Sequence, residues 1–440
     1  MAAHVSPWLA EALGAETTAP PAPPLHGDLE TDVAIVGAGY TGLSAALALR
    51  GAGMRVAVLE REIAGFGASG RNAGHLTPTI GKDLPTLTRM YGRERVQGLV
   101  RLVETAIAHV EGLIERHAID CRYEPVGNVI AAVHPRQHAS IDRAAAAARA
   151  HGIPGEVLEP DAMERRGLPR AFTRGYLEPH GGILHPGRYV RGLRAAALAA
   201  GAVLHEATPV RAVADGPPPV VHAAGGRVRA RHVVLATNAF TPELGRLRSS
   251  VLRLQVQLFR TAPLTPAQRR AVGWPGREGI YTAHEILESY RLTDDDRIVG
   301  GSKAVRYGFR GRALPDTDAG VARLLETTFA ARFPELRDVA ITEHWGGPIA
   351  MSLDFLPVVG RRGAVVHAIG YAGHGLALAS YAGEMIADLL LERDGPGRSL
   401  WSRWSVPLPP EPLRWLAARA LTGIFSAMDR RVDRVATPRR

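Results

Sequence analysis

The chain has 440 residues, and 46% of them are hydrophobic, so it is long enough for two domains and apolar enough to fill a sizeable core. Its 53 basic and 43 acidic residues give a formal net charge of +10, but the basic residues are scattered and form no block, which argues against a nucleic-acid partner. The single cysteine, Cys121, excludes an internal disulfide framework and a cysteine-based metal site. No uninterrupted apolar run reaches the ~18 residues of a membrane span, and no signal-like segment opens the chain. We therefore expect a soluble cytoplasmic protein without a metal or an integral membrane segment.

Residues 1–28 are predicted to form a Pro-rich N-terminal arm. The run Ala-Pro-Pro-Ala-Pro-Pro at 19–24 favours a stiff, extended conformation over packed structure. We interpret the triplet Pro7-Trp8-Leu9 before it as a small anchor on the protein surface.

The most informative stretch covers residues 32–60. A short buried strand is followed by the glycine triplet Gly37, Gly39 and Gly42, by an Ala- and Leu-rich helix, and by a second strand that ends at Glu60. The glycines permit a tight turn, a close approach of backbone amides to a pyrophosphate, and close packing of the helix on the strand. The helix N-terminus offers free N–H groups, and Glu60 can accept hydrogen bonds from ribose hydroxyls. An ordinary glycine-rich turn would not require the acid, so the unit predicts dinucleotide binding.

Two further glycine clusters follow predicted strand ends. In residues 65–75, small residues let the backbone lie flat against a ring or phosphate, while Ser69, Arg71 and Asn72 supply hydrogen-bond donors. Residues 370–375 form another strand–glycine–helix transition, whose helix dipole would face an electron-rich group such as the N1–C2=O edge of a flavin. Either cluster alone fits a plain loop, but three clusters at strand ends favour a flavin dinucleotide over a nicotinamide one.

The remaining periodicity predicts an α/β nucleotide-binding domain that is interrupted by a β-rich domain, without internal repeats. Helices are expected over 81–117 with a break near Tyr91-Gly92, and over 139–150, 186–200 and 375–391. Strands are expected over 126–133, 202–205, 228–236, 252–261, 289–292, 297–301 and 365–369. A basic amphipathic helix over 411–428 is expected to pack on its own domain, with contact to a membrane surface as the alternative.

These motifs, with residues 233–239, resemble the FAD-dependent D-amino acid oxidase superfamily, which includes glycine oxidase, sarcosine oxidase and gamma-glutamylputrescine oxidoreductase. The run 65–72, Gly-Phe-Gly-Ala-Ser-Gly-Arg-Asn, and the lead-in at 27–33 most resemble the last of these branches. The resemblance implies a Rossmann-type FAD-binding domain with an interleaved mixed β-sheet substrate domain, in the D-amino acid oxidase/glutathione reductase-like class. It assigns 29–90, 178–250 and 340–395 to the FAD-binding domain, 91–177 and 251–339 to the substrate domain, and 396–440 to a C-terminal tail.

One departure from the superfamily pattern concerns the substrate. Amino acid oxidases of this group commonly carry Trp-x-Gly-x-Arg-Pro, and here Ile349 stands where the carboxylate-binding Arg would be. Isoleucine cannot hold an α-carboxylate bidentately, which favours an amine without an adjacent carboxylate. Arg291 or Arg306 could replace the missing guanidinium from elsewhere, so a glycine, sarcosine or D-amino acid oxidase or dehydrogenase stays open as an alternative.

The expected chemistry is hydride transfer from an amine C–H to flavin N5, followed by hydrolysis of the imine, with oxygen or another electron acceptor. The candidate catalytic residues are His75, His374, Trp345 and Tyr290, and an aromatic wall for the amine is expected from Tyr281, His284, Tyr290 and Tyr307. The residues assigned to FAD are Gly37, Ala38, Gly39, Tyr40, Thr41, Gly42, Glu60, Arg61, Gly67, Ala68, Ser69, Arg71, Asn72, Ala73, Gly74, Val210, Thr237, Asn238, Gly373, His374, Gly375 and Leu376. His180 and His185 are expected in loops, FAD is expected to be non-covalent, and a flavoprotein with a structural or regulatory role is the non-enzymatic alternative.

Overall fold

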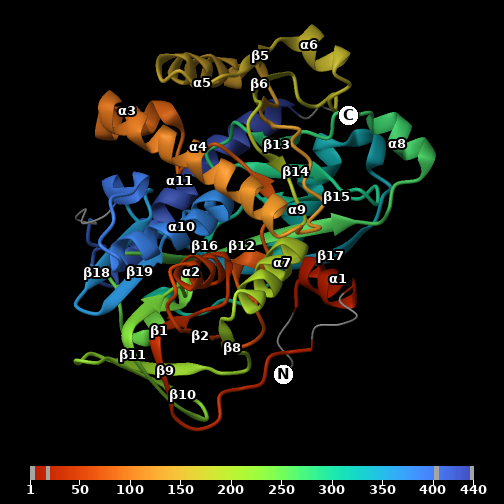
Figure 1. Cartoon of the computed structure of the whole chain (residues 1–440). Coiled ribbons are helices and arrows are strands. Elements are labelled where there is room, and N and C mark those ends of the chain that lie inside the picture. Colours follow the sequence, from red (N-terminus) through yellow and green to blue (C-terminus); the bar gives the residue numbers. More distant parts are fainter. Residues whose placement is uncertain (1–4, 16–19, 401–405, 437–440) are drawn as a thin grey trace.

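Two large β-sheets organise the chain, which a computed structural model describes over residues 5–15, 20–400 and 406–436 (Figure 1). The first sheet has eight strands in the order β18-β19-β11-β1-β2-β8, with β10 on β11 and β9 on β10. Their bounds are β1 (Leu29–Val36), β2 (Val56–Leu59), β8 (Val203–His205), β9 (Val210–Ala214), β10 (Val220–Ala223), β11 (Gly226–Leu235), β18 (Val358–Arg362) and β19 (Val365–Ile369). The central strands run parallel and are buried on both faces, which explains their continuous apolar sequences.

Helices cover the first sheet and carry the strand crossovers. Their bounds are α1 (Pro7–Ala15), α2 (Tyr40–Gly51), α3 (Leu84–Tyr91), α4 (Arg93–Arg116), α7 (Pro186–Ala199) and α10 (Gly375–Leu390). Apolar residues of all six enter the largest core, together with β1, β2 and β19. The predicted helix over 81–117 indeed breaks at Gly92, whose φ of +77° ends α3 and begins α4. The expectation that α4 belongs to the substrate domain is wrong, because its buried face packs into the core of the first sheet.

The second sheet has nine strands in the order β16-β12-β15-β14-β13-β4-β6-β5, with β17 paired to β12. Their bounds are β4 (Asn128–Ala132), β5 (Glu156–Leu158), β6 (Arg174–Glu178), β12 (Leu252–Thr261), β13 (Gly279–Thr282), β14 (Glu288–Leu292), β15 (Ile298–Ser302), β16 (Arg306–Tyr307) and β17 (Ile341–Met351). Residues 340–351 were predicted to belong to the cofactor domain. That boundary is wrong, because β17 pairs with β12 almost along its full length.

The remaining elements surround the second sheet or connect the two sheets. They are the helices α5 (His138–Ala150), α6 (Pro160–Arg165), α8 (Pro266–Val272), α9 (Ala319–Arg332) and α11 (Leu413–Ala436), and the short pair β3 (His75–Leu76) and β7 (Gly182–Ile183). Short 3-10 turns occur at Ala68–Gly70, Pro135–Gln137, Asn238–Leu244, Phe309–Gly311, Pro334–Leu336 and Pro396–Leu400. The mixed α/β architecture with one largely parallel and one largely antiparallel sheet confirms the predicted fold class.

The two faces of the second sheet differ because side chains alternate along each strand. On one face, Tyr290 packs against Phe172 and Phe333, and Glu288 pairs with Arg332 of α9. On the other face, Arg291 donates to backbone carbonyls in the segments that flank β3 and β7. The second face therefore lies toward the first sheet.

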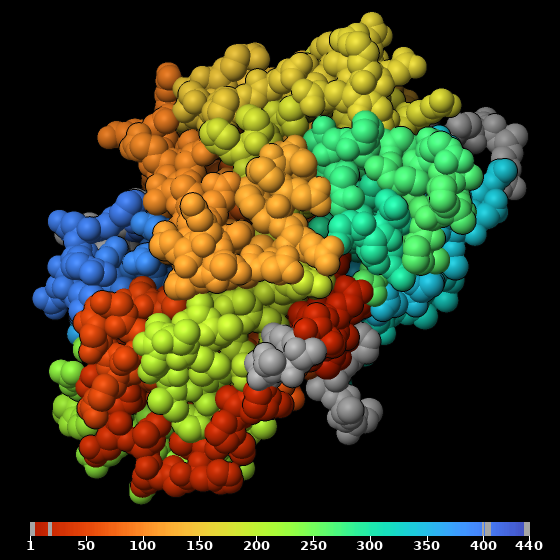
Figure 2. Space-filling view, turned by 45° about the vertical axis from the view of Figure 1, so that its right-hand side comes forward, coloured from red at the N-terminus to blue at the C-terminus, as the bar shows by residue number. Residues whose placement is uncertain are grey.

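The N-terminal segment is packed structure. The Trp8 side chain is 1% exposed and contacts the rings of His185 and Trp345, and Glu11 pairs with His185 and Arg260. In Figure 2 the red surface of this segment lies between a yellow-green surface and a green-to-teal surface. The predicted anchor is therefore buried, and only the proline run after it is extended.

The C-terminal helix α11 reverses the face that its sequence predicts. Asp429 accepts hydrogen bonds from the N–H groups of Glu285 and Ile286, and Asp433 pairs with Lys303 and Arg332, so charged residues dock the helix. Its apolar residues, expected to pack inward, are about half exposed: Leu413, Leu416, Leu421, Ile424 and Met428. Within the described residues, no helix is long and apolar enough to cross a membrane.

Candidate active site

The first glycine loop leaves no room for side chains. A Cβ on Gly42 would overlap the Gly37 carbonyl oxygen, and a Cβ on Gly37 would lie 2.8 Å from the Ala236 carbonyl oxygen. Gly37 also has φ +104°, a conformation that L side chains rarely adopt. The loop at the end of β1 is therefore a backbone surface at the N-terminus of α2, which fits a pyrophosphate.

Glu60 lies at the tip of β2, where the sequence places a ribose ligand. Its carboxylate accepts the N–H of Ala38 at 2.8 Å and of Glu62 at 3.0 Å, which fixes its orientation beside the glycine loop. Burial raises its pKa. The segment just before Val210 also contacts this residue, because the Thr208 N–H donates to the Glu60 carbonyl oxygen. Arg61 lies over the Phe240 ring.

The second glycine loop is held against the first by its own polar side chains. Ser69 Oγ accepts the N–H of Tyr40 at 2.9 Å, and a Cβ on Gly39 would lie 2.8 Å from the same oxygen. Asn72 donates to the Tyr40 hydroxyl and to the Ala68 and Ser69 carbonyl oxygens, so its amide shapes the loop. The loop continues through Ala73 to Gly74, whose N–H donates to Asn72 Oδ1.

Arg71 joins this loop to the second sheet. Its guanidinium lies over the Phe66 ring, donates to the Gly346 carbonyl oxygen at 2.8 Å and pairs with Asp316. The sequence predicted Arg71 as a hydrogen-bond donor to FAD, but in the structure its side chain contacts Phe66, Gly346 and Asp316 of the protein.

The third glycine loop meets the other two. Asn238 Oδ1 accepts the N–H of Gly370 at 3.0 Å, and the hydroxyls of Thr41 and Tyr371 are 2.8 Å apart. Thr237 lies beside Gly37, where its methyl group is 3.4 Å from the position of a Gly37 Cβ. Residues 373–376 then begin α10, with Leu376 buried. The three loops, brought together from residues more than 300 positions apart, form one backbone-lined cradle at strand ends, and this cradle fits an extended dinucleotide.

His75 follows the second loop and carries an unsatisfied nitrogen. Its Nδ1 is 3.0 Å from Asn128 Oδ1, while Asn128 Nδ2 donates to the Leu76 carbonyl oxygen at 2.9 Å. This arrangement makes Oδ1 the acceptor, so Nδ1 carries the proton and Nε2 keeps its lone pair. Nε2 is buried without a hydrogen-bond partner among the described residues, and burial lowers the pKa of His75 to about 4.

His374 lies at the start of α10. Its Nδ1 donates to the Ala372 carbonyl oxygen at 3.2 Å, and burial lowers its pKa. The two neutral histidines come from different glycine loops and are close enough to affect each other's ionisation.

Two predicted catalytic side chains have other positions. Trp345 is fully buried beneath the second loop, where its Nε1–H donates to the Arg71 carbonyl oxygen at 2.9 Å, so it positions the loop. Tyr290 is on the far face of the second sheet, where it packs against Phe333 and donates to Glu288. Neither side chain is placed to touch a substrate at the cradle.

Most residues of the predicted aromatic wall also lie away from the cradle. His284 lies in the far-face cluster with Glu288, and Tyr307 donates to Glu411 at the start of the C-terminal segment. Only Tyr281 is on the face that carries His75, since it follows Gly279 by two residues and a Gly279 Cβ would collide with His75. His180 and His185, predicted as loop residues, pair with Glu104 and Glu11.

Both substitute arginines for an α-carboxylate are engaged elsewhere. Arg291 donates to the carbonyl oxygens of Ala73 and Leu184, and Arg306 pairs with Asp318. Ile349 itself lies at the cradle, with its Cδ1 3.5 Å from the position of a Gly373 Cβ. The apolar residue that replaces the expected arginine is thus placed beside the third loop.

No local sequence pattern indicated Asn128 or its strand partner Glu178. These residues are 50 positions apart and become neighbours only because β4 and β6 pair antiparallel. Alternation within each strand could have suggested that they face the same way as Ile130 and Tyr176, but not which strands pair.

The comparisons with known proteins agree with this geometry. The family described as DAO, FAD dependent oxidoreductase, matches residues 32–389. The chain therefore belongs to this family and is an FAD-dependent oxidoreductase. It is 32% identical over 373 residues to gamma-glutamylputrescine oxidoreductase of Escherichia coli (strain K12), covering 83% of this chain and 85% of that protein.

Glycine oxidase of Geobacillus kaustophilus (strain HTA426) is 27% identical over 377 residues, which are 82% of this chain and 93% of that protein. A crystal structure of glycine oxidase from Geobacillus kaustophilus superposes with a TM-score of 0.73 over 86% of this chain and 100% of that chain, at 23% identity. L-proline dehydrogenase from P. horikoshii gives a TM-score of 0.70 over 83% of this chain and 94% of that chain, at 19% identity. These structures establish the fold.

Proposed function

We propose that this protein oxidises an amine whose reacting carbon carries no carboxylate, such as gamma-glutamylputrescine. The observation that carries the proposal is Ile349, which lies beside the third glycine loop in place of a guanidinium, while Arg291 and Arg306 are bonded to other groups. Without a fork-shaped cation at this point, an α-carboxylate would lose its bidentate partner. The likeness to gamma-glutamylputrescine oxidoreductase supports the same substrate class.

The cradle residues position the cofactor. The glycine loops around Gly37, Gly42 and Gly74 would hold the pyrophosphate and flavin, and Glu60 would hold the ribose. Cys121 is buried, and burial raises the pKa of its thiol to about 12, which keeps it in the unreactive thiol form, so we propose that FAD is held without a covalent bond. When bound, FAD supplies the two-electron acceptor for hydride removal from the carbon next to the amine nitrogen, which leaves an imine that water hydrolyses.

His75 orients the amine. Its neutral imidazole can accept a hydrogen bond from the substrate N–H at Nε2, because Asn128 fixes the proton on Nδ1. A lowered pKa keeps this ring uncharged at neutral pH, so it does not repel a cationic amine approaching from solvent. The second neutral ring, His374, keeps the nearby surface uncharged as well.

The test is anaerobic reduction of the bound flavin, followed by its absorbance. Gamma-glutamylputrescine is expected to bleach the flavin, whereas glycine and sarcosine are expected to leave it oxidised. Bleaching by glycine or sarcosine at comparable rates would favour an amino acid oxidase or dehydrogenase and overturn the argument from Ile349. Repeating the assay with and without oxygen shows whether oxygen is the electron acceptor.

We also propose that the protein acts in polyamine catabolism in the cytoplasm.

A further inference from the structure

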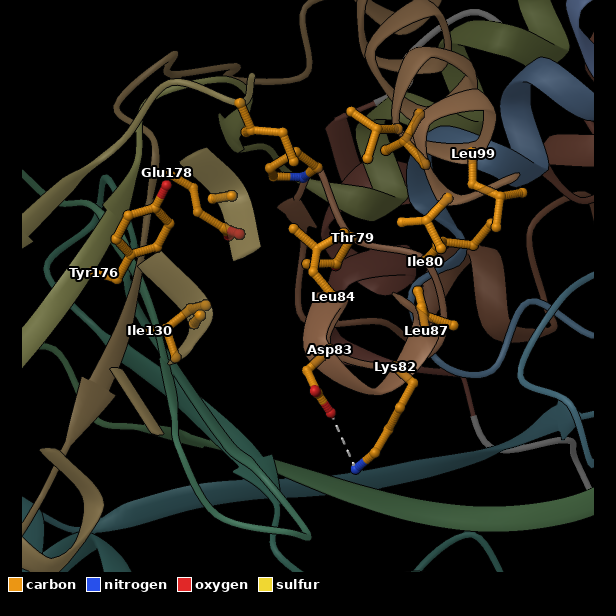
Figure 3. Close-up of a pocket in the computed structure, with 17 residues that line it drawn as sticks. Thr79, Ile80, Lys82, Asp83, Leu84, Leu87, Leu99, Ile130, Tyr176 and Glu178 are labelled. Atoms are coloured by element: carbon orange, nitrogen blue, oxygen red, sulfur yellow. Dashed lines mark ion pairs between the residues drawn. The ribbon is translucent and has the colours of Figure 1, made fainter. Parts of the chain in front are cut away.

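A cleft opens between α3, α4 and α5 on one side and the second sheet on the other (Figure 3). Its helical wall is mostly apolar and includes Leu84, Leu87 and Leu99, and the segment before α3 adds the Lys82–Asp83 ion pair. The sheet wall contributes Ile130 of β4 and Tyr176 and Glu178 of β6. Figure 3 shows the Glu178 carboxylate projecting from the sheet toward the segment that carries Thr79 and Leu84.

Glu178 is a buried carboxylate without a cation. It is 6% exposed, accepts a hydrogen bond from the Tyr281 hydroxyl, and forms no ion pair with any residue in the described part of the chain. Burial raises its pKa to about 7, and the Glu104 carboxylate adds to that rise. A buried carboxylate without a positive partner is costly, so a cationic group that enters the cleft would be stabilised by Glu178.

Tyr176 provides a second unsatisfied group in the same wall. Its ring is 3% exposed, and its hydroxyl is buried without a hydrogen-bond partner among the described residues. Gly155 permits this position, because a Cβ there would collide with the Tyr176 hydroxyl. In Figure 3 the hydroxyl lies on the Glu178 side of the ring. A carboxylate and a hydroxyl side by side in an apolar cleft match the acceptors that an ammonium group requires.

The sheet wall of the cleft is on the same face of the second sheet as Asn128, which holds His75. Glu178 is directly opposite Asn128 in the β4–β6 pairing, and directly opposite residues point to the same face. Asn128 in turn holds His75 Nδ1. Glu178 and His75 are therefore separated by between one and two strand spacings, roughly 5–10 Å, along one wall. An alkyl chain of several methylenes can span that distance.

We propose that this cleft binds the distal ammonium group of an extended aliphatic amine, with Glu178 as its counter-ion and Tyr176 as its hydrogen-bond partner. The inference rests on the proposed function for the reacting end of the substrate, which His75 holds. The apolar helical wall then packs against the methylenes between the two nitrogens. The site selects amines that carry a second cationic nitrogen over simple alkylamines.

Anaerobic calorimetry on the FAD-loaded protein, with its flavin reduced by dithionite beforehand, tests this site without turnover. The probes are 1,5-diaminopentane and pentylamine, which differ only in the distal nitrogen. The unmodified protein is expected to bind the diamine at least 10-fold more tightly than pentylamine. Glu178→Gln is expected to weaken diamine binding at least 10-fold and to leave pentylamine binding unchanged, while Glu178→Asp retains part of the preference.

Glu156→Gln is the matched control, since Glu156 is on the neighbouring strand β5 with its side chain 58% exposed. It is expected to bind both probes as the unmodified protein does. Tyr176→Phe is expected to weaken diamine binding about threefold. An unchanged Kd for the diamine in Glu178→Gln, with normal flavin absorbance showing a folded protein, would overturn the site. If Glu178 governs binding but neither amine bleaches the flavin, the site stands and the proposed oxidation fails.

Discussion

Two buried glutamates on opposite faces of the second sheet have opposite electrostatic surroundings. Glu288 is 1% exposed and pairs with Lys303 at 2.6 Å and Arg332 at 2.8 Å, and these cations lower its pKa to about 2. Glu178 has the Tyr281 hydroxyl and no cation in the described part of the chain, and burial raises its pKa to about 7. The Glu288 carboxylate is neutralised by cations of the protein. We propose that the Glu178 carboxylate is instead neutralised by a cationic group of the substrate.

The different surroundings of the two glutamates suggest that one face of the second sheet stabilises the fold and the other binds the substrate. The far-face cluster around Glu288 includes His284 and Asp433, which with Glu288 bring their ligand atoms within 4.8 Å of one another, as at metal sites. Lys303 and Arg332 already occupy these carboxylates, so the cluster docks α11 onto the sheet. On the cofactor side, the buried atoms without partners among the described residues include His75 Nε2 and the Tyr176 hydroxyl, and we propose that the substrate binds there.

Replacing Glu288, the glutamate that two cations neutralise, should cause the largest loss of stability. Glu288→Ala leaves the buried cations Lys303 and Arg332 with Asp433 as their only carboxylate among the described residues, which should cost about 3 kcal/mol of stability. The urea midpoint of the FAD-loaded protein measures this loss. Glu178→Ala, which removes a carboxylate that has no cation, should shift the midpoint far less, and equal shifts would contradict the comparison.

His75 should show the next largest effect. His75→Leu removes the Nε2 lone pair that we propose accepts the amine N–H, and it fills the site with an apolar side chain of similar size. Amine oxidation should therefore slow about 100-fold, which corresponds to about 2.7 kcal/mol. The rate of anaerobic flavin bleaching measures this. His180→Leu, a partly exposed histidine outside the cradle, is the matched control and should be nearly unchanged.

Ile349 tests the other end of the substrate face. Ile349→Arg should shift preference toward α-amino acids about tenfold, because the new guanidinium can pair with an α-carboxylate beside the third loop. The ratio of kcat/KM values for sarcosine and gamma-glutamylputrescine measures the shift. An unchanged ratio would mean that residue 349 does not face the substrate.

The smallest expected effect is a difference in pH dependence. Because the folded-state pKa of Glu178 lies above its unfolded value of about 4.5, the free protein should lose stability as pH rises from about 4.5 through about 7. Glu288 acts in the opposite sense, since its contribution is present above about 4.5 and is lost as pH falls toward 2. Glu178→Gln should therefore gain about 1 kcal/mol relative to the unmodified protein between pH 6 and pH 7. Urea midpoints at both pH values test this, with Tyr281, Tyr176 and Glu104 as the groups that face Glu178.

The backbone geometry of the first glycine loop could be predicted because its signals are local. Strand, glycines, helix and acid follow one another within residues 32–60, and each glycine is required by backbone positions that the structure reproduces. The prediction that Tyr290 faces the flavin failed because residues 288–292 do not alternate in polarity, so the sequence does not reveal which face is buried in the core.

The substrate wall depended on non-local pairing. Asn128 and Glu178 come together only through the β4–β6 register, and no local pattern indicates that pairing. The C-terminal helix failed for a different reason, because two aspartates bound to buried cations outweighed the apolar stripe in setting its docking face. Ion pairs between distant segments are invisible to a periodicity analysis.

Transient kinetics of flavin reduction tests the central claim most directly, because it separates binding from chemistry on one substrate. With 1,5-diaminopentane, Glu178→Gln should raise the apparent Kd at least 10-fold and leave the limiting rate of reduction nearly unchanged. His75→Leu should lower that limiting rate about 100-fold at a nearly unchanged Kd. If both variants changed the same parameter, or neither changed either, the division of this face into a reacting end at His75 and a binding end at Glu178 would be wrong.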